Sequence, residues 1–202
     1  MTKFETPEGA TPIADAEGLL LPETSTMADL SAAEAENILR AAGKHLRRRH
    51  SPRREWLTDD FLRVVHRDMF DGVWDWAGTY RRAELNIGVA PHRIREEIGK
   101  ACADARFWDN QTENPLPVLE RAARLHHRLA WIHPFRNGNG RHARLVADIY
   151  LNAHGHALPV WPSGDIARKG GARDAYLAAL KEGDRENFTP LMDCTRLYLE
   201  KP

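Results

Sequence analysis

The sequence predicts an all-α domain, a bundle of about six to eight helices with one short β-hairpin. Most segments after residue 30 place apolar residues at three- and four-residue steps, which is typical of helices that bury one side. Only residues 73–91 combine aromatic and β-branched residues with punctuating glycines, as short strands do. A chain of 202 residues is long enough for one well-buried core, and this length favours one domain over two.

Residues 1–29 are expected to form an extended arm, and residues 30–202 the domain. The arm contains three prolines and shows little periodicity, so we expect it to lie on the domain or loose in solvent. The first helix follows it. The segment S-A-A-E at residues 31–34 has the spacing of a capping box, and apolar residues continue at helical steps to about Arg48.

Thr58 begins a second predicted helix, because threonine is a favoured N-cap residue and an apolar side follows it. Asp71 and Gly72 end that helix. The next stretch, 73–91, predicts a short hairpin or an ordered loop, and it is the only candidate β-structure in the chain.

The rest of the chain predicts five more helices, separated by proline- or glycine-containing segments. These helices are expected at residues 92–109, 116–132, 141–154 and about 172–180, with a last one opening at Thr189-Pro190, where threonine caps and proline occupies the first turn.

Charge and composition exclude several functional classes. Lysine plus arginine equals aspartate plus glutamate at 29 each, so no net positive field would draw the protein to nucleic acid or to an anionic membrane. No apolar window approaches the ~18 residues of a membrane span, and no secretory leader is recognisable. Cys102 and Cys194 lack the spacing of a zinc site or a disulfide framework. We therefore expect a cytoplasmic protein that recognises its partner locally.

The stretch HPFRNGNGRHAR, residues 133–144, is the strongest functional signal. Gly138, Asn139 and Gly140 stand directly before a predicted helix, where exposed amides and the helix dipole form an anion site. Arg141 and Arg144, three residues apart, are expected to lie on one face of that helix. Cations oppose the dipole at this end, so the pair indicates a phosphate ligand.

His133 is predicted to face this anion site from the end of the preceding helix. A histidine near neutral pKa beside a bound phosphate is a plausible general base for an attacking hydroxyl. Phe135 is expected to anchor the loop in the core, and His142 to lie at the surface.

These residues resemble the active-site motif of Fic proteins, H-P-F-x-[D/E]-G-N-G-R-x-x-R, at eight of its nine specified positions. The stretch VWDWAGTYRRAELNIGV is similar to the segment that carries the Fic flap, and AARLHHRLAWIHPF to the helix leading into the loop. The resemblance covers roughly residues 30–195 and is closest in kind to the bacterial subgroup called mobile mystery protein B.

The resemblance implies a protein adenylyltransferase that moves AMP from ATP to a serine, threonine or tyrosine hydroxyl of a target protein, with Mg²⁺ and release of pyrophosphate. His133 would be the base, the three residues 138–140 would line the phosphates, and both arginines would hold them. The flap, comprising Leu85, Asn86, Ile87, Gly88 and Val89, would pair with an extended segment of the target.

Asn137 departs from the family pattern, which has aspartate or glutamate there as a metal ligand. Asparagine offers a neutral oxygen that should hold Mg²⁺ less strongly. The departure leaves two alternatives open: a Fic-type transferase of phosphate, UMP or phosphocholine, or a Fic fold that binds a partner without catalysis.

Many Fic proteins carry an inhibitory helix with the pattern [S/T]-x-x-x-E-[G/N]. Its nearest match is the segment 31–37, in which Glu36, or less favourably Glu34, would engage Arg144. A separate antitoxin protein, as in some Fic systems, is an alternative source of this inhibition, and a toxin role follows only from the family.

The sequence fits two other enzyme classes less well. His126, His127 and His133, with Asn137 and Asn139, suggest a His-Asn-His nuclease, but that site needs a hairpin feeding a helix, and here a helix precedes the loop. A zinc hydrolase is disfavoured because the chain has no HExxH segment.

Overall fold

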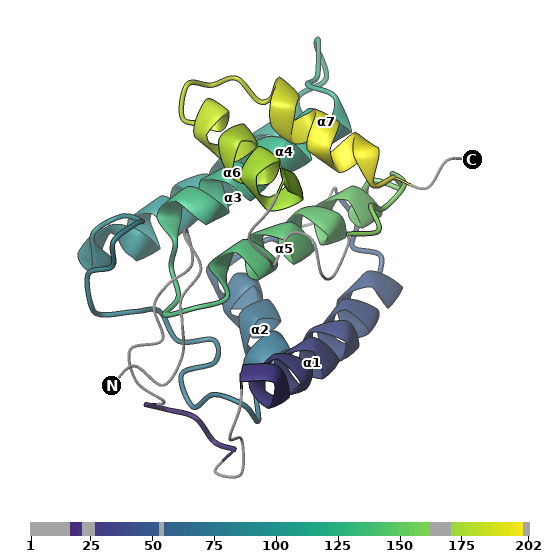
Figure 1. Ribbon diagram of the computed structural model, residues 1–202. Coiled ribbons are helices and arrows are strands. Elements are labelled where there is room, and N and C mark those ends of the chain that lie inside the picture. The colour runs from purple at the N-terminus through teal and green to yellow at the C-terminus, as the bar shows by residue number, and fades with distance from the viewer. Residues whose placement is uncertain (1–16, 22–26, 53–54, 162–170, 200–202) are drawn as a thin grey trace.

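The computed structural model describes residues 17–21, 27–52, 55–161 and 171–199. Within these residues the chain forms seven α-helices and one short 3₁₀ helix (Figure 1), which confirms the predicted all-α class. The elements are α1 (Met27–Arg47), α2 (Asp59–Phe70), η1 (Pro91–Arg93), α3 (Ile94–Asn110), α4 (Val118–Ile132), α5 (Asn139–Ala153), α6 (Gly171–Gly183) and α7 (Thr189–Leu197).

Helices α4 and α5 form the centre of the bundle. They pack against each other, α1 and α2 form a second pair that lies against α5, and α6 and α7 form a third pair that lies against α4 (Figure 1). The main core contains fully buried side chains from α2, α3, α4 and α5: Leu62, Met69, Ile98, Leu125, Leu129, Ile132, Ile149 and Tyr150. A smaller cluster around Tyr176 and Leu191 joins the α6–α7 pair to α4.

Helix α1 begins one turn earlier than the capping box predicted. Ser31 lies inside the helix instead of capping it, and Leu30 is 1% exposed in the main core. Burial of Leu30 extends the helix beyond its local signal. The described part of the arm, residues 17–21, lies on the domain, since the Leu20 amide donates to the Val73 carbonyl at 2.9 Å. The rest of the arm is outside the described residues.

The predicted start of α2 is confirmed, whereas that of α7 is wrong by one residue. Thr58 caps α2, and its hydroxyl accepts a hydrogen bond from the Phe61 amide at 3.2 Å. In α7 the cap position belongs to Phe188, and Thr189 is the first helical residue, followed by Pro190.

The predicted β-hairpin is not confirmed, and the alternative of an ordered loop describes residues 73–91 better. These residues form turns and take part in two isolated bridges, Leu19 with Trp74 and Tyr80 with Phe135. An arginine side chain, that of Arg81, accounts for the missing ladder. It donates to carbonyls of the loop that a partner strand would otherwise satisfy.

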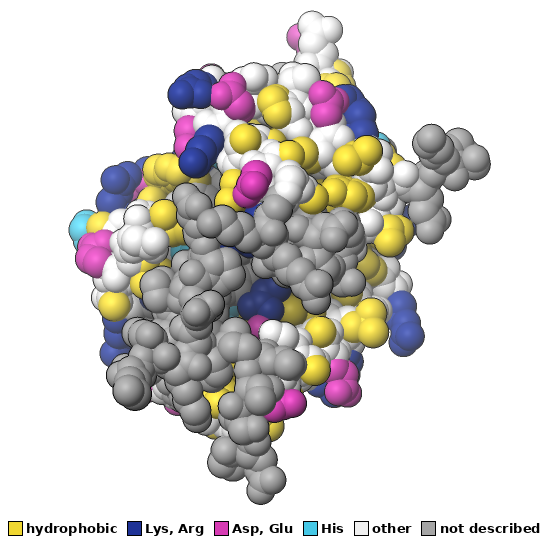
Figure 2. Space-filling model, viewed as in Figure 1, with side chains coloured by type: hydrophobic (Ala, Val, Ile, Leu, Met, Phe, Trp, Pro, Cys, Tyr) yellow, Lys and Arg dark blue, Asp and Glu magenta, His cyan; other side chains and the backbone are white. Residues whose placement is uncertain are grey.

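The described helices include none that is long and apolar enough to cross a membrane. On the face shown in Figure 2, positively and negatively charged side chains are interspersed around apolar ones. This mixture agrees with the equal numbers of basic and acidic residues in the sequence.

Candidate active site

The motif loop, residues 133–138, joins the end of α4 to the start of α5 and is anchored by Phe135. The Phe135 ring is fully buried and stacks on His66 of α2 with centroids 3.6 Å apart. His142 packs against the same ring edge-on at 4.9 Å. The prediction that His142 lies at the surface is therefore wrong: it is 0% exposed, and its Nε2 is 2.9 Å from the Leu62 carbonyl.

The Asn139 side chain stabilises the motif loop through two hydrogen bonds to the loop backbone. Its side-chain amide donates to the Phe135 carbonyl at 2.9 Å, and its Oδ1 accepts from the Phe135 amide at 2.8 Å. The Asn139 side chain is thus committed to the loop, and only its backbone amide is placed to meet a ligand. His66 adds a second brace, because its Nε2 lies 3.0 Å from the Asn137 carbonyl. His66 was missed in the sequence, where it looks like any histidine on an amphipathic helix.

The two glycines of the motif, Gly138 and Gly140, have different structural roles. Gly138 has φ of 75°, and a Cβ there would lie 2.3 Å from the Phe70 ring, so only glycine fits. A Cβ on Gly140 would meet open space. The first amides of α5 have no partner within the helix, and Gly140 leaves the approach to them open.

His133 has the geometry of a base held in one tautomer. It is the C-cap of α4 in a left-handed conformation, with φ of 52° and ψ of 58°, and it is 8% exposed. Its Nδ1 lies 3.2 Å from the Ala130 carbonyl, so Nδ1 carries the hydrogen and Nε2 carries the basic lone pair. Burial, helped by the Arg81 cation and opposed by the Ala130 carbonyl, lowers the pKa of His133 to about 4. His133 is therefore neutral at pH 7.

Arg141 and Arg144 turn to different neighbours, so the prediction that they share one face of α5 is not what their contacts show. Arg141 pairs with Glu34 of α1 at 2.5 Å and lies over the Phe70 ring at 4.9 Å. Arg144 lies over the Tyr176 ring of α6, 5.2 Å from its centroid.

A buried polar cluster supports Arg144. Its neighbour one turn along α5, Asp148, accepts from the Trp161 indole at 3.1 and 3.0 Å, and the Tyr176 hydroxyl lies 2.8 Å from His126 Nε2. Burial raises the pKa of Asp148 to about 7, although the Trp161 hydrogen bond and the Arg144 charge oppose the change. Asp148 thus changes its charge close to neutral pH.

Of the two glutamates predicted as inhibitory, only Glu34 contacts a motif arginine. Besides Arg141, it accepts a hydrogen bond from the Trp74 indole at 2.7 Å, and it is 6% exposed. Glu36 is exposed on the other side of α1, and among the described residues no hydrogen bond or ion pair joins it to Arg141 or Arg144.

Asn137 is placed to offer at most one oxygen to a metal ion. Its Oδ1 accepts from the Gly138 amide at 2.7 Å, which leaves one lone pair. In the part of the chain that the structure describes, no three His, Cys, Asp or Glu side chains gather to hold a metal. Asn137 therefore fits Mg²⁺ only as one ligand among phosphate oxygens and waters.

The flap residues lie beside His133, on a loop fixed at both ends by Arg81. Asn86, Ile87 and Gly88 are exposed, and a Cβ on Gly88 would lie 2.6 Å from the His133 Cβ. The Val89 amide donates to the Ile132 carbonyl at 3.2 Å. Sequence reasoning missed Arg81, because the segment Tyr80-Arg81-Arg82 gives no sign of which arginine is buried.

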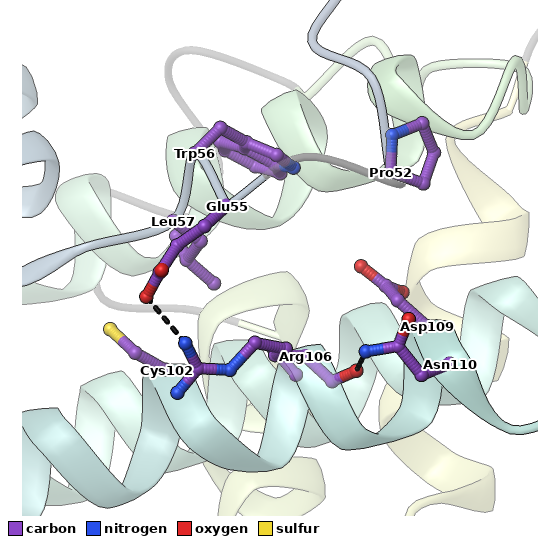
Figure 3. A pocket seen from close by; sticks show the side chains of 9 residues that line it. Pro52, Glu55, Trp56, Leu57, Cys102, Arg106, Asp109 and Asn110 are labelled. Carbon is purple, nitrogen blue, oxygen red and sulfur yellow. Dashed lines mark hydrogen bonds and ion pairs between the residues drawn. The ribbon is translucent and has the colours of Figure 1, made fainter.

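A small pocket that Pro52 and residues 55–57 form with α3 is a poor alternative site (Figure 3). The Glu55–Arg106 ion pair at 2.5 Å crosses it, and no residue of the motif lines it. Its Cys102 is a poor nucleophile, because burial raises the pKa of the thiol to about 12.

Comparisons with known proteins identify the family of the chain. The Fic/DOC family profile matches residues 56–151, which include the flap and the motif. A protein adenylyltransferase, fic-1 of Caenorhabditis briggsae, is 31% identical over 109 residues, 52% of this chain and 21% of that protein. The chain thus spans about a fifth of that relative's length.

Two further relatives and one crystal structure extend the match. A uridine 5′-monophosphate transferase of Xanthomonas campestris is 36% identical over 80 residues, 39% of this chain and 15% of that protein. The N-terminal Fic domain of a VirB-translocated Bep effector from Bartonella quintana shares the fold, with a TM-score of 0.68 at 19% identity over 87% of this chain and 84% of that one. A Fido domain-containing protein of Dictyostelium discoideum is 39% identical over 113 residues, 54% of this chain and 72% of that protein. The chain therefore belongs to the Fic/DOC family.

Proposed function

We propose that the protein is a protein adenylyltransferase, which transfers AMP from ATP to a serine, threonine or tyrosine hydroxyl of a target protein. The observation that carries this proposal is the arrangement of the site: a neutral buried histidine ends α4, and the short loop after it leads to the N-terminus of α5, whose first turns carry two arginines. Several relatives named protein adenylyltransferases support it.

The reaction would use the site in a simple way. The hydroxyl oxygen of the target attacks the α-phosphorus of ATP, the bond from that phosphorus to the bridging oxygen breaks, and pyrophosphate leaves. His133 Nε2 takes the hydroxyl proton. Binding of a nucleotide brings negative charge next to His133, and this charge raises the pKa of the imidazole above its value in the unbound protein.

The phosphates would be held by the backbone amides at the start of α5 together with Arg141 and Arg144. Mg²⁺ is part of the proposal: bound to the phosphates, it would neutralise charge that develops during transfer. The Asn137 amide oxygen would then be one of its ligands, alongside phosphate oxygens and waters.

The flap would present the acceptor hydroxyl. No backbone–backbone hydrogen bond among the described residues involves positions 84–88, so their amides and carbonyls are available to an extended segment of the target. The target is thus proposed to add a short strand beside His133.

Transfer of UMP is a second candidate, supported by the relative that is named a uridine 5′-monophosphate transferase. ATP and UTP differ in the base and not in the phosphates, so the phosphate contacts of the motif would serve either nucleotide. A test must therefore offer both donors.

Regulation by Glu34 is also proposed. This buried carboxylate holds Arg141, a guanidinium that the phosphates need, so it would compete with the nucleotide. A separate antitoxin protein remains an alternative, and a toxin role would follow from it. Under that alternative, Glu34→Gln would leave nucleotide affinity unchanged.

The first experiment is intact-mass spectrometry of the wild type and His133→Ala after incubation with Mg²⁺ and either ATP, UTP or CDP-choline, with and without cell lysate as a source of target. We expect addition of one AMP to the protein or to a lysate protein, slowed ~10²–10⁴-fold in His133→Ala. Addition from another donor would keep the mechanism and change the substrate. Absence of transfer from every donor, also in Glu34→Gln, would favour a binding module without catalysis.

A further inference from the structure

We propose that Arg81 is a positioning residue that fixes the flap relative to the His133 backbone. This contact would align the acceptor hydroxyl with the imidazole that takes its proton. The inference rests on the proposed function for its kinetic part. Its structural part stands on one guanidinium that donates to three carbonyls in two separate segments of the chain.

The contacts of Arg81 divide between the two segments. Its Nε donates to the His133 carbonyl at 2.7 Å, and its Nη1 donates to the Ala83 carbonyl at 3.0 Å. Its Nη2 donates to the Val89 carbonyl. Val89 is the last residue of the flap and Ala83 lies two residues before its first, so a single side chain links both sides of the flap to the residue that carries the base.

The backbone of Arg81 adds to the same link. Its amide donates to the Pro134 carbonyl at 3.0 Å, directly after His133. The left-handed φ of 52° at His133 is uncommon for a residue with a side chain and needs support from its surroundings. The bond from Arg81 to the His133 carbonyl provides support at the strained residue itself.

Burial explains why only arginine suits this position. Arg81 is 7% exposed, and none of the ion pairs found in the described ranges includes it. Its charge is therefore balanced by carbonyl dipoles and by the nearby Glu84 carboxylate, and burial lowers the pKa of the guanidinium below its usual value although the Glu84 charge opposes the change. A planar fork with five donors can reach three carbonyls at once, whereas a lysine ammonium is a compact group on a flexible stem.

Two substitutions separate the geometry of Arg81 from its charge. Arg81→Lys keeps the charge and loses the fork, and Arg81→Met loses both. Arg63→Met is the matched control, because Arg63 also donates to a backbone carbonyl of this segment, that of Gly78 at 3.0 Å, but does not touch the flap ends or His133.

The readouts are amide hydrogen exchange of residues 83–89, the titration of His133 by NMR, and transfer kinetics. We expect faster exchange of the flap in both Arg81 variants and not in Arg63→Met. Arg81→Met should raise the pKa of His133, since the Arg81 charge lowers it, while Arg81→Lys should not. The acceptor kcat/KM should fall about 10²-fold in both variants, with nucleotide Kd unchanged.

Flap exchange and His133 titration that match the wild type in both variants would overturn the proposal. If the wild type transfers no nucleotide, the proposed function fails, yet exchange and titration still decide the role of Arg81. If neither variant folds, the Nε–H signal of Arg81 in the wild type decides it. The signal should exchange slowly if the bond to the His133 carbonyl exists, and rapid exchange would refute the contact.

Discussion

The motif loop and the flap meet at His133, the first residue of the loop, but the structure holds them in different ways. The loop is fixed through its interior, by the buried Phe135 ring, by the Asn139 brace and by His66. The flap is fixed only on its two sides, at Ala83 before it and at its last residue Val89, and residues 86–88 are exposed. A phosphate is the same in every nucleotide, so a rigid loop suits it, whereas a protein acceptor needs a surface that can adjust.

The largest predicted effect is loss of stability in acid, and it comes mainly from the loop side, where three of the four histidines concerned lie. His66, His126, His133 and His142 are buried, and burial lowers the pKa of each below 6.5. Below pH 6.5 the unfolded chain binds protons that the folded chain does not, so stability is full above pH 6.5 and falls as pH drops towards about 4. Each histidine contributes ~1.4 kcal/mol per pH unit.

Urea unfolding between pH 7.5 and 4.5 measures how steeply the free energy of unfolding changes with pH. His142→Phe should reduce the slope by the share of one histidine, while replacement of the exposed His92 by asparagine should leave it unchanged. Equal slopes in all three proteins would mean that the loop histidines do not control acid stability.

Truncation of one anchor in each region is expected to separate the two regions. Phe135→Ala removes a fully buried ring and should lower the free energy of unfolding by ~3–5 kcal/mol. Ile87→Ala removes a flap side chain that is 40% exposed, and it should change the free energy of unfolding by less than ~0.5 kcal/mol. The same substitution should slow transfer to a protein acceptor. Denaturant midpoints and acceptor kinetics check both. A large stability loss in Ile87→Ala would erase the distinction between the regions.

Substitution of two glycines by alanine tests the geometry of the loop and of the first turn of α5. Gly138→Ala should cost ~1–3 kcal/mol or more, because its Cβ would meet the Phe70 ring and its φ is 75°. Gly140→Ala should keep or slightly raise stability, because its Cβ meets open space within α5, but it should weaken nucleotide binding. Thermal unfolding and calorimetric titration with ATP distinguish these outcomes. Unchanged ATP affinity in Gly140→Ala would move the nucleotide away from the start of α5.

The sequence predicts the loop side better than the flap side. Local signals define the two caps of α2, Thr58 and Asp71, and the left-handed Gly138 before α5, because capping and glycine conformation act within a few residues, whereas Asn139 and Gly140, expected to precede the helix, are its first residues. Residues Glu34 and Glu36 show the limit. They lie about 200° apart around α1, and only the packing of α1 on α5 decides which of them faces Arg141.

The flap shows the same limit in another form. The aromatic and β-branched residues of the segment 73–91 favour strands, yet Arg81 satisfies the carbonyls of Ala83 and Val89 in place of a partner strand. Burial of Arg81 and of His142 depends on contacts with residues 52 and 80 positions away, His133 and Leu62. No periodicity along the chain contains that information.

A smaller effect is expected where α1 meets the loop. Glu34→Gln removes the charge that holds Arg141 while keeping an acceptor for the Trp74 indole. We expect about tenfold tighter ATP binding, the equivalent of ~1.4 kcal/mol, because a buried competitor for the guanidinium is lost. Glu36→Gln is the matched control and should leave affinity unchanged. Weaker binding in Glu34→Gln would mean that the carboxylate orients Arg141 for the phosphates instead of competing with them.

The smallest effect concerns Arg144, on the other side of the loop. Asp148 is neutral below about pH 7 and ionised above it, and the ionised form attracts the neighbouring Arg144 guanidinium away from a phosphate. ATP affinity should therefore rise about two- to threefold from pH 8 to pH 6, the size of a screened interaction of ~0.5 kcal/mol. In Asp148→Asn this pH dependence should vanish, and the affinity should stay at the value that the wild type reaches at pH 6. Dependence that persists in the variant would assign it to the nucleotide or to another group, and Arg144 would then be held by Tyr176 alone.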